Sequence, residues 1–524
     1  MRGIGSRRAA AACLLGLGIM AGGAARGETP PCRDVLSALP AATGALDLDQ
    51  HEIDTLKGFY VTRNERCAWS DADIAVLTDA LAGVANEALD PARYRPDAIR
   101  AAAPGGARDL AASAMALRYA HDQVYGRVDL ARLETDIDMP RPADDLAPRL
   151  DRALGQNGLA AWLADLAPSE PGYRRLVEAY RRLRDRPADI DPEPIGPGPV
   201  LKPGASGPRV AAIQARLRRL GDLRDGANGP EFDTATRDAL AAFQRRNGLA
   251  DDGRLTRETQ AALDMTDSAR LRQIALNLER WRYVGHVLSA SRIEVNTAAA
   301  TFALLEDNKV AMAMRAVVGD PRHHSPMLVS AGIDAIVVNP TWYVPESIVA
   351  KEIEPRLERE PDYLESNEMH WDGERLLQAP GAKNSLGRIK FDFPSRFAVY
   401  LHDTPSHGYF ARAMRQLSHG CIRLEKPREL ALRLLADDGK WTEERLKKAI
   451  DSGATERIAV PAGPQVALLY WTAFVDDDGM LEFRNDVYGR DARLETVLGG
   501  TPVAARGMVR LASQRGVQHA NAAP

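Results

Sequence analysis

A proline-rich stretch divides this chain of 524 residues into parts with different hydrophobic patterns. Seven prolines fall within residues 186–208, which predicts a stiff, extended linker. Outside this stretch, apolar residues repeat with helical spacing up to about residue 285. Beyond that point, short β-type runs alternate with Asp, Asn and Gly turns. We therefore expect a multidomain α+β protein rather than a single core.

The composition is that of a globular protein, with 45% hydrophobic and 27% charged residues. The net charge is −4, and no run is rich in Lys or Arg. This balance gives no electrostatic reason to expect a nucleic-acid partner.

The first 27 residues have the pattern of a targeting segment. A basic start, "MRGIGSRR", precedes an apolar run over residues 9–25, and small residues follow. This pattern predicts a signal peptide or an uncleaved membrane anchor over residues 1–27. We expect an exported protein whose contact with a membrane, if any, is through this segment alone.

The chain contains four cysteines, of which Cys13 lies in the targeting segment. In an oxidising compartment we expect Cys32 and Cys67 to form a disulfide. Cys421 is then left without a partner, so its presence calls for a chemical role.

The region before the linker, residues 33–190, is predicted to be a helical scaffold domain. Ile74, Leu77 and Leu81 share one helical stripe, with Asp71 or Asp73 as the expected cap.

Residues 200–265 form a compact unit of three predicted short helices, the second capped by Asp233. The segments "GASGPRVAAIQARLRRLG", "FDTATRDALAAFQRRNGL" and "DDGRLTRETQAAL" resemble the three-helix peptidoglycan-binding domain of cell-wall enzymes. A three-helix spacer that binds nothing remains the alternative.

We expect residues 285–455 to form a mainly β catalytic domain, interrupted by a helix-prone insertion at about 345–387. The run "FAVYLHD" places His402 at the end of a strand. Residues 456–495 are predicted to contain a hairpin that returns to the scaffold or catalytic domain, and residues 496–524 a tail. Aspartates in the hairpin turn lack the further ligands of a calcium loop.

The motif "SHGCIRL" surrounds Cys421, and three histidines, His402, His407 and His419, fall within eighteen residues just before it. A zinc site is one interpretation, but no second Cys or spaced His supports it. An inert core thiol is another, although the neighbouring residues are polar. A nucleophile activated by an imidazole fits best, because Gly420 allows close backbone approach and adjacent N–H groups bind an oxyanion.

The segment "YLHDTPSHGYFARAMRQLSHGCIRL" resembles the signature of the L,D-transpeptidase catalytic domain. With "NSLGRIKFDFP" and "VVNPTWYVPESI", it is similar to the large periplasmic subfamily, over about residues 35–495. That resemblance implies a helical scaffold, an inserted peptidoglycan-binding domain and a substrate-capping insertion.

The resemblance implies that Cys421 is the nucleophile and His402 the general base and later acid, with His407 as the rival base. It implies that Ser418 and His419 orient the site, and that Gly420 together with Cys421 supplies oxyanion N–H groups.

Four further residues are expected to bind substrate: Arg423, Tyr400, Trp342 and Tyr343. His323 and His324, in a proline-flanked turn, match nothing functional and are expected to face solvent.

The implied reaction forms 3→3 peptidoglycan cross-links through a cysteine thioester, with release of D-Ala from a tetrapeptide donor stem. The resemblance implies a periplasmic enzyme that needs no metal or organic cofactor and is acylated by carbapenems. Stem peptides are the expected partners, and other cell-wall synthases are further candidates. An L,D-carboxypeptidase or cysteine hydrolase of wall peptides, and an inactive wall-binding scaffold, remain as alternatives.

Overall fold

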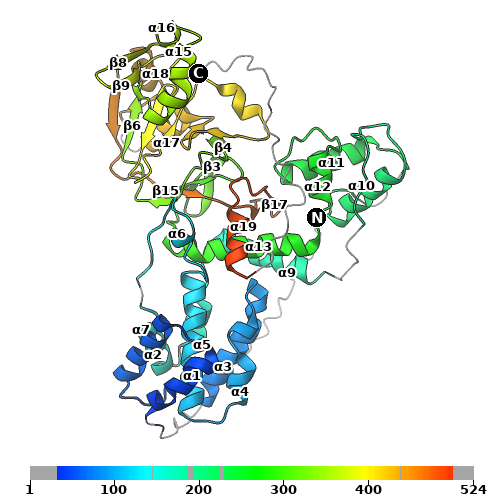
Figure 1. The fold of residues 1–524 in the computed structure, drawn as a ribbon, viewed down its shortest axis with the longest axis vertical. Coiled ribbons are helices and arrows are strands. Elements are labelled where there is room, and N and C mark those ends of the chain that lie inside the picture. Colours follow the sequence, from blue (N-terminus) through cyan, green and yellow to red (C-terminus); the bar gives the residue numbers. More distant parts are fainter. Residues whose placement is uncertain are drawn as a thin grey trace, which may run out of the picture.

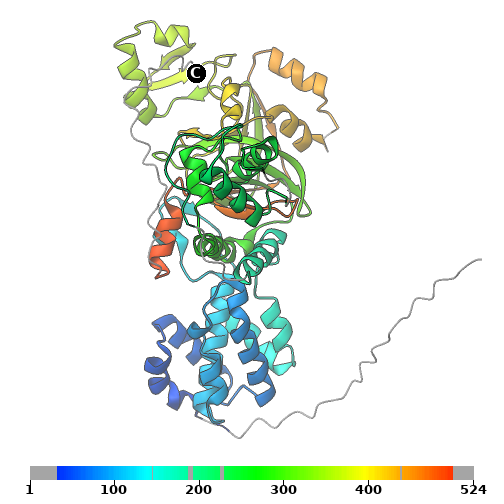
Figure 2. The same cartoon turned by 90° about the vertical axis from the view of Figure 1, so that its right-hand side faces the viewer.

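The computed structural model describes residues 32, 34–143, 145–186, 193–224, 229–436 and 439–499. A helical bundle lies at one end of an elongated molecule and a large sheet lies towards the other (Figures 1 and 2). None of the helices in these ranges combines the length and apolar character that crossing a bilayer requires. The predicted targeting segment, residues 1–27, and residues 500–524 of the tail lie outside the described residues.

The bundle is built around one long helix, α5 (Gly106–Val124), whose buried residues occupy most of its length. The other α-helices of this region are α1 (Leu39–Leu46), α2 (Gln50–Thr62), α3 (Asp71–Ala82), α4 (Pro96–Ala101), α6 (Leu130–Leu133), α7 (Leu146–Gly155), α8 (Leu159–Ala164) and α9 (Pro171–Arg184). Short 3-10 helices connect them: η1 (Val35–Ala38), η2 (Gly83–Glu87) and η3 (Pro91–Arg93). The helical prediction for this region is therefore confirmed.

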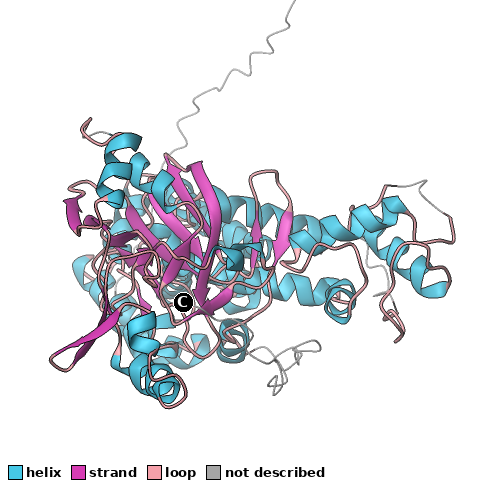
Figure 3. Ribbon diagram, turned by 90° about the horizontal axis from the view of Figure 1, so that it is seen from above, coloured by secondary structure: helices cyan, strands magenta, loops and turns pink. Residues whose placement is uncertain are grey.

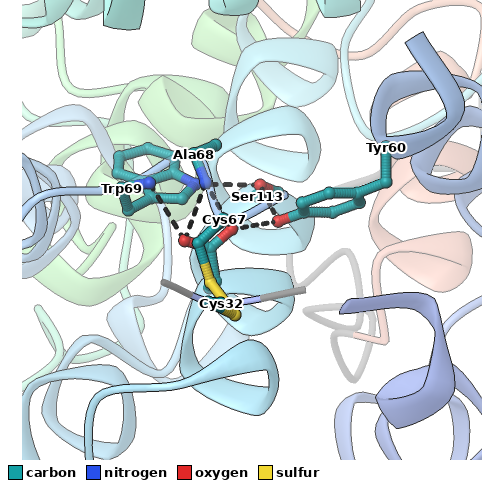
Figure 4. Close-up of a disulfide and its surroundings, with 7 residues drawn as sticks. Cys32, Tyr60, Cys67, Ala68, Trp69 and Ser113 are labelled. Atoms are coloured by element: carbon teal, nitrogen blue, oxygen red, sulfur yellow. Dashed lines mark hydrogen bonds between the residues drawn. A yellow bond between two sulfur atoms is a disulfide. The ribbon is translucent and has the colours of Figure 1, made fainter. Parts of the chain in front are cut away.

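The start of the bundle is held by the Cys32–Cys67 disulfide, which confirms that pairing (Figure 4). Next to it, the buried Asp109 carboxylate accepts hydrogen bonds from the backbone N–H groups of Ala68 and Trp69, both at 2.9 Å. It also accepts a 2.7 Å bond from the Tyr60 hydroxyl. A buried carboxylate is tolerated only when it is satisfied in this way.

The cap of α3 differs from the prediction. Ser70, rather than Asp71 or Asp73, is the capping residue, and its Oγ accepts from the Asp73 N–H. Asp73 takes the reciprocal position of a capping box, which satisfies two otherwise free N–H groups.

The three-helix unit consists of α10 (Pro208–Arg219), α11 (Thr234–Arg246) and α12 (Arg257–Leu263). Its core contains Val210, Ile213, Leu217, Leu240 and Phe243, and Asp233 caps α11 as predicted. The described end of the proline-rich linker packs onto this unit, because Ile195 is buried and its N–H donates to the Asp264 carboxylate. The unit also contacts the C-terminal hairpin, where Arg484 donates to the Arg246 carbonyl at 2.7 Å.

Helix α13 (Asp267–Val284) joins the bundle to the sheet, and the short helix η4 (Gly285–Val287) follows it. Trp281 of α13 stacks on Trp471 with ring centroids 4.4 Å apart. Buried Arg282 donates to Gln123 of the bundle at 3.1 Å, so the junction is both packed and hydrogen-bonded.

Most strands gather in one part of the molecule (Figure 3), in a twelve-stranded sheet. Its order is β1-β5-β15-β2-β3-β4-β13-β11-β10-β6-β14, and β12 pairs with β4 beside this path. The bounds are β1 (Ile137–Asp138), β2 (Arg292–Asn296), β3 (Thr301–Glu306), β4 (Lys309–Gly319), β5 (Met327–Ser330), β6 (Ala335–Val338), β10 (Ile389–Asp392), β11 (Leu401–His402), β12 (Gln416–Ser418), β13 (Ile422–Leu424), β14 (Glu456–Ala459) and β15 (Gln465–Leu469).

Three further helices and a hairpin complete this end of the chain. They are α17 (Pro427–Leu434), α18 (Glu443–Asp451), α19 (Arg490–Val497) and the hairpin β16 (Ala473–Val475) with β17 (Leu481–Phe483). The hairpin predicted within residues 456–495 is confirmed. Arg490 of α19 is buried and donates to the Asp136 carboxylate at 2.6 Å, next to β1.

The insertion at about 345–387 is only partly helical, which corrects the expectation of a helical cap. It contains α14 (Glu346–Ile348), a π-helical turn η5 (Val349–Ile353), α15 (Glu354–Leu357) and α16 (Tyr363–Ser366). It also carries β8 (Met369–Asp372) and β9 (Arg375–Gln378), which form a three-stranded sheet with β7 (Trp342–Tyr343). We call residues 345–387 the roof segment.

Candidate active site

The sheet brings the two predicted catalytic residues together although nineteen residues separate them. Strand β11 ends at His402, as predicted, and runs parallel to β13, with Leu401 opposite Ile422 and His402 opposite Arg423. The Ile422 N–H donates to the Tyr400 carbonyl at 3.2 Å. Cys421 lies in the turn between β12 and β13, one residue before this pairing begins.

The turn that carries Cys421 is fixed by two serines. Ser418 Oγ donates to the Cys421 carbonyl at 2.6 Å, and Ser325 Oγ donates to the Gly420 carbonyl at 2.7 Å. Gly420 has a φ of 113°, a left-handed conformation that side chains disfavour. The structure therefore explains why the sequence places Gly before the cysteine.

One expected role is not supported by this turn. The Gly420 N–H donates to Ser418 Oγ at 3.2 Å, so in this structure it is not free to bind an oxyanion. The expectation considered only the close backbone approach that Gly allows and overlooked that Ser418, two residues earlier, could occupy the N–H.

His402 is buried, with only 4% of its surface exposed. Its Nδ1–H donates to the Asp403 carbonyl at 2.6 Å, which leaves Nε2 as the proton acceptor. Burial, followed by the Arg423 charge, lowers the pKa of His402 to about 3. The imidazole is therefore neutral in the resting site and able to act as a base.

The Asp403 carboxylate holds the loop behind His402. It accepts from the Arg388 N–H at 2.8 Å and from the Thr404 N–H at 2.7 Å. Gly387 is required here, because a Cβ at this position would lie 2.4 Å from Asp403 Cγ. These contacts position the carbonyl that orients the imidazole.

Burial raises the pKa of the half-buried Cys421 thiol, and a hydrogen bond from Tyr400 with the charges of Lys390 and Arg423 opposes that increase. Together with the lowered pKa of His402, this direction favours a neutral thiol and a neutral imidazole in the wall of one cavity. We infer that the thiolate forms during attack on substrate rather than as a resting ion pair.

Tyr400 contacts both Cys421 and His402. Its hydroxyl is hydrogen-bonded to the Cys421 side chain and to Trp342, and burial raises the pKa of Tyr400. Its ring centroid lies 5.7 Å from that of His402, and Lys390 Nζ lies 4.2 Å from the ring centroid of Tyr400. Tyr400 is thus placed to stabilise developing thiolate charge as well as to contact substrate.

A cavity of about 350 Å³, which we call the catalytic cavity, opens over Cys421. Its wall includes seven of the predicted site residues: Trp342, Tyr400, His402, Ser418, His419, Cys421 and Arg423. Tyr343, which was also expected to bind substrate, is not part of this wall and is 60% exposed, so the structure does not place it with the others. Adjacent residues of a strand point to opposite faces, which explains the difference from Trp342.

The structure favours His402 over its rival. His407 lies in the exposed 3-10 helix η6 (His407–Ala411) and lines a neighbouring cavity rather than the one that contains Cys421.

Arg423 supplies positive charge to the catalytic cavity. Its guanidinium carbon lies 5.8 Å from the Tyr409 ring centroid, and its Nε is buried without a hydrogen-bond partner in the described part of the chain. A cation held in this way can bind a substrate carboxylate.

The roof segment closes one side of the catalytic cavity. Ile348, Ile353, Tyr363 and Met369 contribute apolar surface, and Glu352 accepts a hydrogen bond from His419 Nε2 at 2.5 Å.

His323 and His324 do not face solvent as predicted. Both are half-buried, and the His323 ring centroid lies 4.9 Å from that of His419 in the wall of the catalytic cavity. His324 stacks on Tyr488 with centroids 4.4 Å apart. The turn before β5 folds back over the motif, and no local sequence pattern indicates this.

Sequence reasoning also missed Ser325, Glu352 and Lys390. Only Lys390 had a local signal, because it lies in a strand next to the one that ends at His402. Over the residues that the structure describes, no group of three or more His, Cys, Asp or Glu side chains is arranged to hold a metal ion.

Comparison with known families gives three matches. Residues 290–448 match the model of the L,D-transpeptidase catalytic domain, residues 54–179 that of a scaffold domain, and residues 206–263 that of a "Putative peptidoglycan binding domain". A curated protein of Haemophilus influenzae, named "Putative L,D-transpeptidase", is 29% identical over 272 residues. The alignment spans 47% of this chain and about half, 54%, of that protein.

Two solved structures align more loosely. The L,D-transpeptidase of Xylanimonas cellulosilytica is 20% identical, with a TM-score of 0.18 over 52% of this chain and 100% of that one. The L,D-transpeptidase of Mycobacterium smegmatis is 15% identical, with a TM-score of 0.19 over 34% and 58%. Together the three domain matches show that this chain carries an L,D-transpeptidase catalytic domain, preceded by a scaffold domain and a domain of the peptidoglycan-binding type.

Proposed function

We propose that the protein is a peptidoglycan L,D-transpeptidase that forms 3→3 cross-links in the periplasm, with Cys421 as nucleophile and His402 as base and acid. The observation that supports this proposal is that the pairing of β11 with β13 carries both His402, a buried imidazole, and Cys421, a free thiol, into the wall of one cavity under the roof segment.

In the first step, Cys421 Sγ attacks the carbonyl that follows the L-centre of the third residue of a tetrapeptide donor stem. His402 Nε2 takes the thiol proton as the C–S bond forms. The C–N bond to the terminal D-Ala then breaks, and the imidazolium gives its proton to the leaving amine.

In the second step, the side-chain amine of another stem attacks the thioester carbonyl. A C–N bond forms, the C–S bond breaks, and His402 carries the amine proton to the departing thiolate. Tyr400 and the charges of Lys390 and Arg423 favour the thiolate in both steps. General acid–base help of this kind contributes roughly 10²–10⁴-fold.

The three-helix domain supports the proposal, because it matches a family described as peptidoglycan-binding, and peptidoglycan is also the proposed substrate. It is docked on the hairpin β16–β17, which packs against α13 and α9 rather than over the catalytic cavity. We propose that it holds peptidoglycan while the catalytic domain acts on a stem.

The test is intact-mass analysis of the mature protein mixed with meropenem and, separately, with a tetrapeptide stem. We expect one adduct per chain, absent in Cys421→Ala and formed much more slowly in His402→Ala. His407→Ala is the matched control, because it removes a nearby histidine outside the catalytic cavity and should acylate at the wild-type rate.

Product analysis then separates cross-linking from hydrolysis. A cross-linked dimer in the presence of a second stem supports the proposal, and release of free tripeptide alone indicates a carboxypeptidase. Failure of the wild-type protein to form any adduct, with Cys421 shown to be reduced, would remove the enzymatic proposal altogether.

A further inference from the structure

A second cavity, of about 360 Å³, lies next to the catalytic cavity and shares Thr404 in its wall. Three chain segments form most of it: residues 387–388 before β10, residues 403–407 after β11 and residues 425–429 at the start of α17. It is as large as the catalytic cavity, and none of the chemistry described above uses it.

Three cations line this second cavity: Arg388, Lys426 and Arg428. In the described part of the chain, none of them forms an ion pair with a carboxylate. Arg388 reaches only the Asn339 side-chain oxygen, at 3.5 Å. Lys426 and Arg428 are exposed, and Arg388 is half-buried.

Two of the acidic residues in the same wall already have hydrogen-bond partners. Asp403 accepts from two backbone N–H groups, and the Arg315 guanidinium lowers the pKa of Glu425 by direct hydrogen bonding. Glu429 is exposed on the first turn of α17. Outside the wall, Asp451 is close enough for Arg388 and Arg428 to lower its pKa, but its carboxylate is bonded to Lys447. Three carboxylates thus lie in the same wall as the three cations, but Asp403 and Glu425 are held by bonded partners, whereas none of the cations is bonded to a carboxylate within the described residues, which leaves the cations available to an anionic ligand.

The wall between the two cavities is the loop that controls the catalytic base. The Asp403 carbonyl holds His402 Nδ1, while Asp403 and Thr404 also line the second cavity. A ligand bound there lies behind the imidazole and can extend over Thr404 towards Cys421.

We propose that this second cavity, the acceptor cavity, binds the carboxylate groups of the incoming acceptor stem and directs its amine to the thioester. The inference rests on the proposed function and adds the site of the second substrate. During the second step the donor acyl group occupies the catalytic cavity under the roof segment, so the acceptor must approach from another side. A stem amine that is flanked by free carboxylates matches a site with three unpaired cations.

The test measures the two half-reactions separately in the full chain. Thioester formation is followed by intact mass, and cross-linked product by chromatography as the acceptor stem is varied. The variants are Arg388→Gln, Lys426→Gln, Arg428→Gln and the double variant of the two arginines. Lys448→Gln is the matched control, because Lys448 is exposed on neighbouring α18 and lines neither cavity.

We expect each single variant to raise the acceptor KM by roughly 3–10-fold, and the double variant by roughly 10–100-fold, with the donor KM at the wild-type value. The wild-type protein should also prefer an acceptor with a free carboxylate beside the amine over the same acceptor with a carboxamide. The double variant should lose that preference.

Two results would overturn the assignment. If the variants acylate normally and keep the wild-type acceptor KM and carboxylate preference, the acceptor does not bind in this cavity. If donor KM rises as much as acceptor KM, the cavity serves the donor. A wild-type protein that forms no thioester at all would instead overturn the proposed function, and the inference with it.

Discussion

The Glu352 carboxylate of the roof segment accepts a hydrogen bond from His419 in the motif that carries the nucleophile. Glu352 lies in the π-helical turn η5, and such turns often occur at functional sites. This hydrogen bond joins the roof segment to the turn around Cys421. Both side chains are partly exposed, at 45% and 35%, so the pair contributes only modest free energy.

Glu352→Gln should therefore raise the donor KM by about 2–5-fold, the equivalent of one partly exposed polar contact. The rate of acylation at saturating donor should change little, because neither group touches the reacting atoms. Steady-state kinetics with a tetrapeptide donor measure both quantities. Glu354→Gln, an exposed change two residues along the chain, is the control and should leave KM unaltered.

The ionisation state of Cys421 can be read from its alkylation by iodoacetamide. Because burial raises the pKa of this thiol, the alkylation rate should climb steadily between about pH 6 and pH 9. The Cys421→Ala variant gives the background rate of alkylation, because the other two cysteines of the described residues are joined in the disulfide. An alkylation rate that does not change with pH on the acid side of this range would show a preformed ion pair with His402 and contradict the neutral resting state.

His402 should make the folded protein sensitive to acid. Its pKa falls from 6.5 to about 3 on burial, so the unfolded chain takes up a proton before the folded one as pH decreases. The stability that comes from the neutral imidazole is complete above pH 6.5 and is lost as the pH falls towards 3.

Urea unfolding at a series of pH values tests this expectation. His402→Asn, whose amide can still donate to the Asp403 carbonyl, should lose less stability on acidification than the wild type. Parallel curves for the two proteins would mean that His402 is not held neutral.

Alanine substitutions at two glycines with the same backbone conformation can distinguish the cost of backbone strain from the cost of a steric clash. Gly387 and Gly373 have φ values of 63° and 59°, but an added Cβ meets Asp403 at Gly387 and nothing within 4 Å at Gly373. Gly373→Ala should cost about 1–2 kcal/mol of unfolding free energy, the usual cost of a left-handed residue.

Gly387→Ala should cost about 2–4 kcal/mol, because a clash is added to the same strain. It should also slow thioester formation, since displacement of Asp403 moves the carbonyl that orients His402. Denaturant unfolding and intact-mass kinetics provide the two measurements. Equal losses in the two variants would show that the Asp403 contact is not needed.

The disulfide closes a sequence separation of 35 residues at the start of the bundle. Cys32→Ala/Cys67→Ala should lower the unfolding free energy of the bundle by roughly 3–4 kcal/mol on the chain-entropy model. Acylation of Cys421 at temperatures where the bundle stays folded should not change. Reducing agent should destabilise the wild type but not the double variant, and an equal response in both would contradict this account.

Much of the arrangement of the candidate site could be predicted because it is local in the sequence or ends a strand. Cys421, Ser418 and Arg423 lie in one short motif, and the apolar run before His402 fixes where that strand ends. The disulfide was expected because the targeting pattern predicts export to an oxidising compartment, where Cys32 and Cys67 can pair. These signals depend on residue type and spacing alone.

The errors arose where distant segments meet. His323 and Glu352 reach the site from a turn and an insertion that no periodicity connects to the motif. Tyr343 was misplaced because a two-residue strand gives no alternation from which to choose its face. The Gly420 N–H is occupied by a side chain whose orientation depends on the folded turn.

The order of strands in the large sheet has a consequence for how this protein is made. Strand β15 lies between β2 and β5, and both of these neighbours precede it by well over a hundred residues. Until residues 465–469 have left the ribosome, the sheet has an open slot at this position, with unpaired backbone groups on both sides. Cys421 is thus synthesised before the sheet that supports it can close. We expect nascent chains that end before β15 to be prone to aggregation, and folding to be completed only after synthesis has passed this strand.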